Sequence, residues 1–148
     1  MRVLSLTKKI YELVYSEEPK LEDIEVLSKG INEDAFDKMQ MDPVRTFGIF
    51  IKDLNGETLG GVTGFSYFGC LHTDTLWINM VLRGQGLGNK LMMKVEEIAI
   101  ERKCRFATVY TMDFQALNFY LKLGYEIEFV REDYEKQSKM FMLKKKLI

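Results

Sequence analysis

The sequence predicts a fold of the α/β class, an α+β mixed sheet with helices on its faces, and three observations lead to this prediction. Strand-like runs alternate with helix-like runs along the chain, and apolar residues make up 47% of it. A chain of 148 residues is the size of one ordinary domain and can bury a core. Two prolines and no low-complexity segment leave no obvious linker. We therefore expect residues 1–148 to form a single domain with the element order β-α-β-β-β-α-β-α-β-β.

The first half of the chain predicts strands, a helical segment and a hairpin. Residues 20–39 place apolar side chains near a helical period and should form one or two helices. Four segments are rich in β-branched, aromatic or continuous apolar residues and are expected to be strands, namely residues 9–17, 46–53, 58–69 and 75–82. Asn55-Gly56 stands between the second and third of these and is a strong signal for a hairpin turn.

The second half predicts two helices and three strands. Residues 86–102 carry one apolar stripe and should form an amphipathic helix. Asp113 is placed to cap the N-terminus of a short helix, which Gly124 then ends. Strands are expected at residues 105–112, 125–130 and 139–147.

Charge and composition exclude several classes of function. A net charge of −1 gives no overall field that would attract nucleic acid or an anionic membrane. No run reaches the length of a membrane span, and charges interrupt residues 1–15 too often for a signal peptide, so we expect a cytoplasmic protein. Cys70 and Cys104 show neither metal-ligand nor redox spacing, so we expect reduced thiols and no metal.

Residues 81–92, VLRGQGLGNKLM, place three glycines at alternate positions between a strand-like and a helix-like run. The start of a helix offers unpaired amides and partial positive charge, which together bind anions. The dinucleotide pattern G-x-G-x-x-G fails because Asn89 stands where the third glycine is required, and the P-loop pattern fails because Leu91 follows Lys90. The simpler alternative is a tight turn in which the glycines only allow positive φ angles.

The spacing that fits is Arg/Gln-x-x-Gly-x-Gly/Ala, read at Arg83, Gly86 and Gly88. This is similar to the acetyl-CoA pyrophosphate motif of the GNAT superfamily of N-acetyltransferases. The segment FQALNFYLKLGYEIE resembles the late helix-to-strand block of the same family, with matches at Ala116, Phe119, Tyr120, Gly124 and Tyr125. The two blocks occur in the family's order, so the resemblance covers about residues 20–146 and implies a GNAT-like fold.

The resemblance implies acetyl-CoA as cosubstrate and direct transfer of its acetyl group to a primary amine in a ternary complex. Leu76, Trp77 and Ile78 align with the strand that pairs with the pantetheine arm, where one amide would polarise the thioester carbonyl. The residues implied to wrap the pyrophosphate are Arg83, Gly84, Gln85, Gly86, Leu87 and Gly88. Tyr120 aligns with the general acid that protonates the departing thiolate, and the alternative role for Tyr120 is a core aromatic.

Two positions depart from the family's pattern. Asp113 stands where many members have an asparagine that contacts CoA, so cofactor contact and helix capping both stay open for it. Thr108 stands where some relatives carry a glutamate, so the general base is unresolved. The candidates for that base are His72, Asp74, Glu126, Glu128 and water.

Other functions and the acceptor stay open. A domain of the same fold that binds acetyl-CoA without turnover is the main alternative, and acyl transfer through a cysteine has little support because no cysteine stands near a histidine–carboxylate pattern. We expect the acceptor to carry an amine and to be a small molecule or a peptide. The acidic residues Glu33, Asp34 and Asp37 could attract a cationic acceptor, although such a patch is usually a solvated helix face. A homodimer stays open as well.

Overall fold

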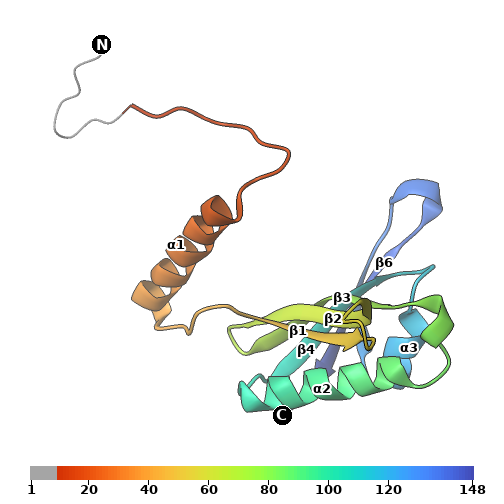
Figure 1. Ribbon diagram of the computed structural model, residues 1–148. Coiled ribbons are helices and arrows are strands. Elements are labelled where there is room, and N and C mark those ends of the chain that lie inside the picture. Colours follow the sequence, from red (N-terminus) through yellow and green to blue (C-terminus); the bar gives the residue numbers. More distant parts are fainter. Residues whose placement is uncertain (1–9) are drawn as a thin grey trace.

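Six strands form one mixed sheet in the computed structural model, which describes residues 10–148 (Figure 1). The elements follow in the order α1 (Leu21–Met39), β1 (Arg45–Lys52), β2 (Thr58–Tyr67), β3 (Cys70–Ile78), η1 (Met80–Leu82), α2 (Leu87–Glu101), β4 (Phe106–Met112), α3 (Leu117–Lys122), β5 (Glu126–Arg131), η2 (Glu135–Gln137) and β6 (Met140–Lys146). The strand order is β1-β2-β3-β4-β6-β5, with β3 and β4 parallel and the other neighbours antiparallel. The predicted α/β class with a mixed sheet is confirmed.

Two tight turns build the antiparallel half of the sheet. The predicted turn at Asn55-Gly56 is confirmed: the Asp53 carboxylate accepts hydrogen bonds from the amides of Asn55 and Glu57, at 2.8 and 2.9 Å. A second turn joins β2 to β3 at Phe68 and Gly69, whose φ angles are 47° and 85°. Positive φ at both central residues matches the twist of a two-residue hairpin. Because of this turn, β3 begins at Cys70, five residues earlier than expected.

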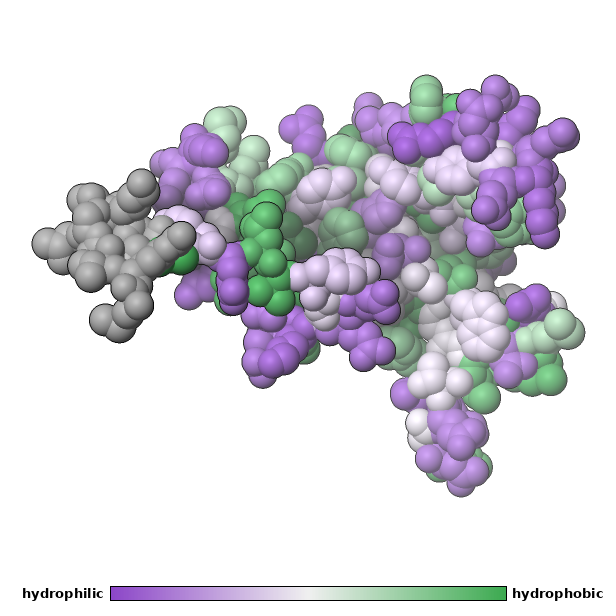
Figure 2. All heavy atoms as spheres, turned by 90° about the horizontal axis from the view of Figure 1, so that it is seen from above, coloured by the Kyte–Doolittle hydropathy of each residue, from purple (hydrophilic) through white to green (hydrophobic). Residues whose placement is uncertain are grey.

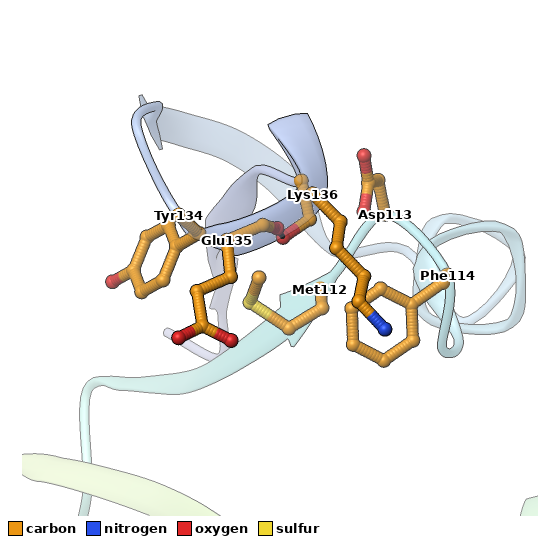
Figure 3. A pocket seen from close by; sticks show the side chains of 7 residues that line it. Met112, Asp113, Phe114, Tyr134, Glu135 and Lys136 are labelled. Carbon is orange, nitrogen blue, oxygen red and sulfur yellow. Dashed lines mark hydrogen bonds between the residues drawn. The ribbon is translucent and has the colours of Figure 1, made fainter.

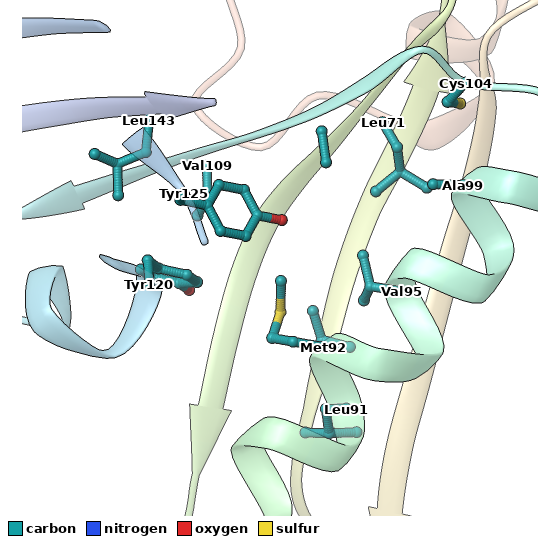
Figure 4. Packing of buried hydrophobic residues seen from close by; sticks show 12 residues of the cluster. Leu71, Leu91, Met92, Val95, Ala99, Cys104, Val109, Tyr120, Tyr125 and Leu143 are labelled. Atoms are coloured by element: carbon teal, nitrogen blue, oxygen red, sulfur yellow. The ribbon is translucent and has the colours of Figure 1, made fainter. Parts of the chain in front are cut away.

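The core lies between the sheet and α2 (Figure 4). The buried side of α2 consists of Leu91, Met92, Val95 and Ala99. Facing it are the sheet residues Val62, Leu71, Ala107, Val109 and Leu143. Tyr120 of α3 and Tyr125 close one end of this cluster. The amphipathic helix expected at 86–102 is therefore confirmed, and its apolar stripe forms one wall of the core.

Arg102 fastens the C-terminal end of α2 to the edge of the sheet. Its guanidinium donates to the carbonyl oxygens of Arg45 and Thr46, at 2.8 and 3.0 Å, and to the Ser66 hydroxyl at 3.1 Å. A guanidinium spreads its donors over a rigid planar fork, whereas the three donors of a lysine all lie on one nitrogen atom. The side chain therefore sets the direction in which α2 crosses β1 and β2.

The N-terminal arm, residues 10–39, lies apart from the sheet (Figure 1). No residue of α1 is buried, although one helix does form where one or two were expected. The strand expected at 9–17 is wrong for residues 10–17, which have no regular structure and are exposed; residue 9 lies outside the described residues. A strand needs a partner edge, and this segment reaches none among the residues that the structure describes.

Candidate active site

The sheet splits at its centre, between β3 and β4. These strands pair only from Cys70 with Phe106 to Thr73 with Val109, although both continue further. Asp74 has no partner on β2, because the register shifts there as in a β-bulge. A bulge bends its strand and disrupts the local ladder. The unpaired main-chain groups on either side of the split are available to a ligand.

A cleft of about 510 Å³ lies beside this split, between the end of β3, the start of α2 and the start of α3. Its lining residues are Leu76, Trp77, Ile78, Arg83, Gly88, Phe114, Gln115, Ala116 and Phe119. Five predicted cofactor residues are thus brought together, and Gly84, Gln85, Gly86 and Leu87 form the adjoining turn. The lining is mainly apolar, as is usual for a ligand site with a few polar anchors.

The glycine turn leaves the start of α2 accessible. Gly84 and Gly86 have φ angles of +81° and +77°, and nothing lies within 4 Å of where a Cβ would stand on either. The first bond of the helix runs from the Lys90 amide to the Gly86 carbonyl oxygen, at 3.1 Å. Amides before that point have no helical partner. Glycine is therefore favoured at both positions by the positive φ angle and by the open space, which lets a ligand approach the backbone closely.

Gly88 packs closely against α3. A Cβ at Gly88 would stand 3.2 Å from the Phe119 ring. A side chain there would require this ring to shift by a few tenths of an ångström. The Arg83 side chain is also held by the protein, because its Nε donates to the Ile78 carbonyl oxygen at 2.9 Å. This bond ties the turn to the end of β3.

Tyr120 lies on α3 at the edge of the core, and only 4% of it is exposed. Its ring packs edge-on against Phe119 and Tyr125, with ring centroids 5.1 and 5.8 Å away. Burial raises the pKa of Tyr120 from 10.0 to about 12. The hydroxyl therefore keeps its proton at neutral pH, which a proton donor requires and which a core tyrosine also shows.

The helix cap predicted at Asp113 is wrong. The helix α3 begins only at Leu117, and the Thr111 hydroxyl accepts from the Ala116 amide at 3.1 Å. Asp113 instead lies on a hollow of about 760 Å³ at the end of β4 (Figure 3). Tyr134, Glu135, Lys136 and Ser138 of the β5–β6 connection line the opposite side. Phe114 borders both this hollow and the cleft, so the two are neighbours.

His72 lies within β3 and is buried, whereas the sequence placed it in a loop. Its Nδ1 is 2.8 Å from the Thr108 hydroxyl, and its ring packs on Tyr110 with centroids 4.6 Å apart. Burial lowers the pKa of His72, and the Asp74 carboxylate opposes this shift only in part. A neutral imidazole therefore sits where the β3–β4 pairing ends.

The other base candidates are placed less favourably. Glu126 and Glu128 lie on β5, and β6 separates that strand from β4. Cys70 shares the Thr108 hydroxyl with His72, at 3.4 Å from its sulfur, a proximity that the sequence did not show. Burial raises the pKa of the Cys70 thiol, which disfavours the thiolate that a nucleophile needs.

The sequence gave no site role to three cleft residues, although Phe119 is one of the matches in the late block. Phe114, Gln115 and Phe119 line the cleft from the β4–α3 side. The Gln115 side-chain oxygen accepts from the Met112 amide at 3.0 Å and so shapes the turn after β4. They lie within or beside the late block that resembled the family, but only contact with Gly88 across the fold reveals the role of Phe119.

Within residues 10–148, no three histidine, cysteine or acidic side chains gather closely enough to hold a metal ion. In the same part of the chain, no helix is both long and apolar enough to cross a membrane.

The split in the mixed sheet leaves an open strand edge beside the unpaired amides at the start of α2. The chain belongs to the Acetyltransferase (GNAT) family, whose model matches residues 7–125. Blasticidin-S acetyltransferase of Streptomyces morookaense is 35% identical over 97 residues, which are 65% of this chain and 71% of that protein. The protein is accordingly an acyltransferase.

Two solved structures share most of the chain. A crystal structure of an acetyltransferase from Bacillus cereus ATCC 14579 is 30% identical, with a TM-score of 0.73, and the match covers 90% of this chain and 98% of that one. A crystal structure described as an acetyltransferase from Agrobacterium tumefaciens has a TM-score of 0.79 at 23% identity, covering 93% of this chain and 100% of that one. Both matches are long enough to include α1.

Proposed function

We propose that the protein is an acetyl-CoA-dependent N-acetyltransferase that transfers the acetyl group directly to a primary amine. The observation that carries this proposal is the cleft, because one opening joins the free edge of β3, the glycine turn and α3. A long ligand that carries a thioester and a pyrophosphate could use all three features, with β3 and α3 beside the thioester and the glycine turn beside the pyrophosphate. Family membership supports the same cosubstrate.

The pyrophosphate would be held by the turn from Arg83 to Gly88. Main-chain amides at the start of α2 and the partial positive charge of that helix end suit a diphosphate. The open space around Gly84 and Gly86 lets phosphate oxygens approach the backbone. The Arg83 guanidinium adds a fixed positive charge beside the cleft.

The thioester end would lie along β3, at Leu76, Trp77 and Ile78. The edge of these residues that faces β4 is unpaired, so their amides and carbonyls can pair with an amide-containing arm as another strand would. An amide that points at the thioester oxygen stabilises the charge that develops there during attack. Tyr120 would then donate a proton to the departing sulfur.

The amine would enter from the side of the hollow lined by Asp113 and Glu135. Two carboxylates against the single ammonium of Lys136 leave this hollow with a net negative charge, which favours a cationic amine. The name of the Streptomyces relative indicates a small-molecule acceptor for that protein. His72, neutral because of its burial, is the preferred base, acting directly or through water. We therefore propose a small cationic amine as substrate.

Calorimetric titration with acetyl-CoA tests the cofactor site, using two variants of one residue. Gly86→Glu places a carboxylate beside the phosphates, where a like charge at about 4 Å costs about 4 kcal/mol at an effective dielectric constant near 20. We expect affinity to fall by more than about 100-fold. Gly86→Ala carries the same positive-φ strain without the charge, so it is the matched control.

The proposal fails if Gly86→Glu binds acetyl-CoA as tightly as Gly86→Ala. The acceptor is tested separately, by measuring CoA release with polyamines, aminoglycosides, blasticidin S, amino acids and peptides. Release with small cationic amines is expected, and release with peptides alone would replace that acceptor class while leaving the cofactor site intact.

A further inference from the structure

The helix α1 carries an apolar stripe that no other residue between 10 and 148 covers. At 100° per residue, Leu21, Ile24, Leu27 and Ile31 fall on one side of the helix. Their exposed fractions run from 42% for Ile24 to 71% for Leu27. An amphipathic helix owes most of its stability to the surface on which its apolar face packs. The stripe therefore indicates a packing surface outside this chain's own contacts.

The sheet face opposite α2, called here the open face, is the matching surface. Phe50 and Trp77 both lie beside Gly61 on this face, and each is about half exposed, at 53% and 52%. Tyr110 and Phe129 both pair with Met142 and are 49% and 55% exposed. Figure 2 views the molecule from this side, where side chains of hydrophobic or intermediate hydropathy lie over the arm and the neighbouring sheet.

A parallel strand pair at the centre of a sheet normally has both faces covered. The pair β3–β4 is parallel, and α2 covers one face only. Among the described residues, no other helix of this chain lies on the open face. Its two rows of aromatic side chains thus have no covering layer of helices among the described residues.

The linker after α1 turns the helix away from its own sheet. Gln40 adopts a left-handed conformation at the helix end, and its amide donates to the Phe36 carbonyl oxygen at 2.8 Å. The Asn32 side-chain oxygen accepts from the Val44 amide at 3.1 Å, which fixes the linker against the helix. Folding α1 back over its own open face would break these bonds, so a second chain is the better occupant.

Charges along the borders of the two surfaces also match. Asp23 and Asp34 flank the apolar stripe on one side and Glu25 on the other. On the sheet, Lys52 lies over the Phe50 ring and Lys144 over the Phe106 ring, at 5.6 and 4.5 Å from the ring centres. A helix laid on the open face would bring carboxylates toward Lys52, whereas Lys144 already lies 3.9 Å from the Glu128 carboxylate.

We propose that two copies of the chain exchange their N-terminal arms, so that α1 of each copy packs its apolar stripe on the open face of the other. Such an exchange closes with twofold symmetry and covers both stripes and both faces at once. Trp77 belongs to the open face and also lines the cleft. The exchanged helix would therefore form one wall at the mouth of the neighbouring active site.

Light scattering of the full-length protein and two variants tests the exchange. The wild type should have twice the 17.3 kDa mass of one chain. The double variant Ile24→Glu/Ile31→Glu places charges in the stripe and should halve that mass. Val26→Glu is the matched control, because Val26 is 69% exposed but lies on the opposite side of α1, and its mass should stay that of the dimer. A monomeric wild type, or a double variant that stays dimeric like the control, would overturn the proposal.

Cross-linking distinguishes exchange from folding back, without relying on a destabilised variant. An unlabelled chain with a photoreactive benzoylphenylalanine in place of Ile31 is refolded with a tenfold excess of ¹⁵N-labelled wild type. Exchange predicts cross-links between the light α1 peptide and heavy peptides of β1 to β4. Cross-links that join α1 only to light sheet peptides, or only to peptides of the α2 side, would refute it.

Discussion

At the scale of single residues, Tyr120 shows that one side chain can satisfy a structural and a chemical requirement together. Its ring fills the end of the core, which explains its burial. The same burial raises its pKa to about 12, which keeps the hydroxyl protonated. Removing the hydroxyl while keeping the ring separates the two roles.

We expect Tyr120→Phe to keep the fold and acetyl-CoA affinity, and to lower kcat by about 10²–10⁴, the range that general acid catalysis supplies. Because the tyrosine stays protonated until about pH 12, the loss should be the same at every pH from 6 to 10. Steady-state kinetics across that range measures it. A wild-type kcat in a folded Tyr120→Phe variant would remove the residue from the mechanism.

Tyr125 supplies the control for that variant. Its hydroxyl is buried without a hydrogen-bond partner, and burial raises its pKa. Removing an unpaired buried hydroxyl relieves a desolvation cost, so Tyr125→Phe should raise stability by about 1 kcal/mol. Its turnover should stay close to that of the wild type. Denaturant unfolding and the same kinetic assay show whether the two tyrosines differ as expected.

At the scale of elements, Arg102 is the strongest polar link between α2 and the edge of the sheet. We expect Arg102→Lys to lower the free energy of unfolding by about 1–2 kcal/mol, because one ammonium cannot replace three directed bonds at the partly exposed edge. Arg105→Lys is the matched control, since Arg105 is exposed. Urea unfolding of both variants measures the free energy that each one loses. Equal losses would show that the three hydrogen bonds of Arg102 add no specific stability.

Periodicity predicted the elements that pack locally and missed features set by distant partners. The helix at 86–102 and the turn at Asn55-Gly56 depend on local patterns, and both are confirmed. The early start of β3 depends on the turn at Phe68. Because phenylalanine rarely takes positive φ, the composition of this segment did not predict a turn there. Residues 10–17 have the composition of a strand, but a strand forms only where an edge is available.

The candidate site divides in the same way, into residues that a local pattern marks and residues whose place depends on distant contacts. A spacing motif marks the turn from Arg83 to Gly88, whereas Leu76 to Ile78 were assigned through the family resemblance. Five of these residues line one cleft. Asp113 and His72 were misplaced because a helix start and a strand start were misjudged by a few residues. The contact of Gly88 with Phe119 joins two helices and leaves no local signature.

At the scale of the whole molecule, the single histidine links stability to pH. Burial holds the pKa of His72 below 6.5 in the folded state, while the unfolded chain takes up a proton near pH 6.5. Below that pH the unfolded state binds more protons, so stability falls as pH falls until the folded state is protonated too. His72 thus contributes stability at neutral pH that acid removes.

We expect His72→Gln to lose less stability than the wild type between pH 7.5 and 5.5. Glutamine keeps a polar group for the Thr108 hydroxyl but does not titrate. Denaturant unfolding at three pH values in this window measures the difference between the two proteins. Parallel curves for both would show that His72 titrates in the folded protein as it does in the unfolded chain.

Amide hydrogens near the split should exchange with solvent in an unusual pattern. In most sheets the central strands are protected best, because their main-chain bonds break only when the whole domain unfolds. Beyond Thr73 and Val109, the amides of β3 and β4 that face each other have no bond to break. They can exchange without any opening of the domain, while the amides of β3 that face β2 stay protected. We therefore expect amide protection to be lowest along the middle of the sheet. A molecule that binds in the split would slow amide exchange there before it changed any other property.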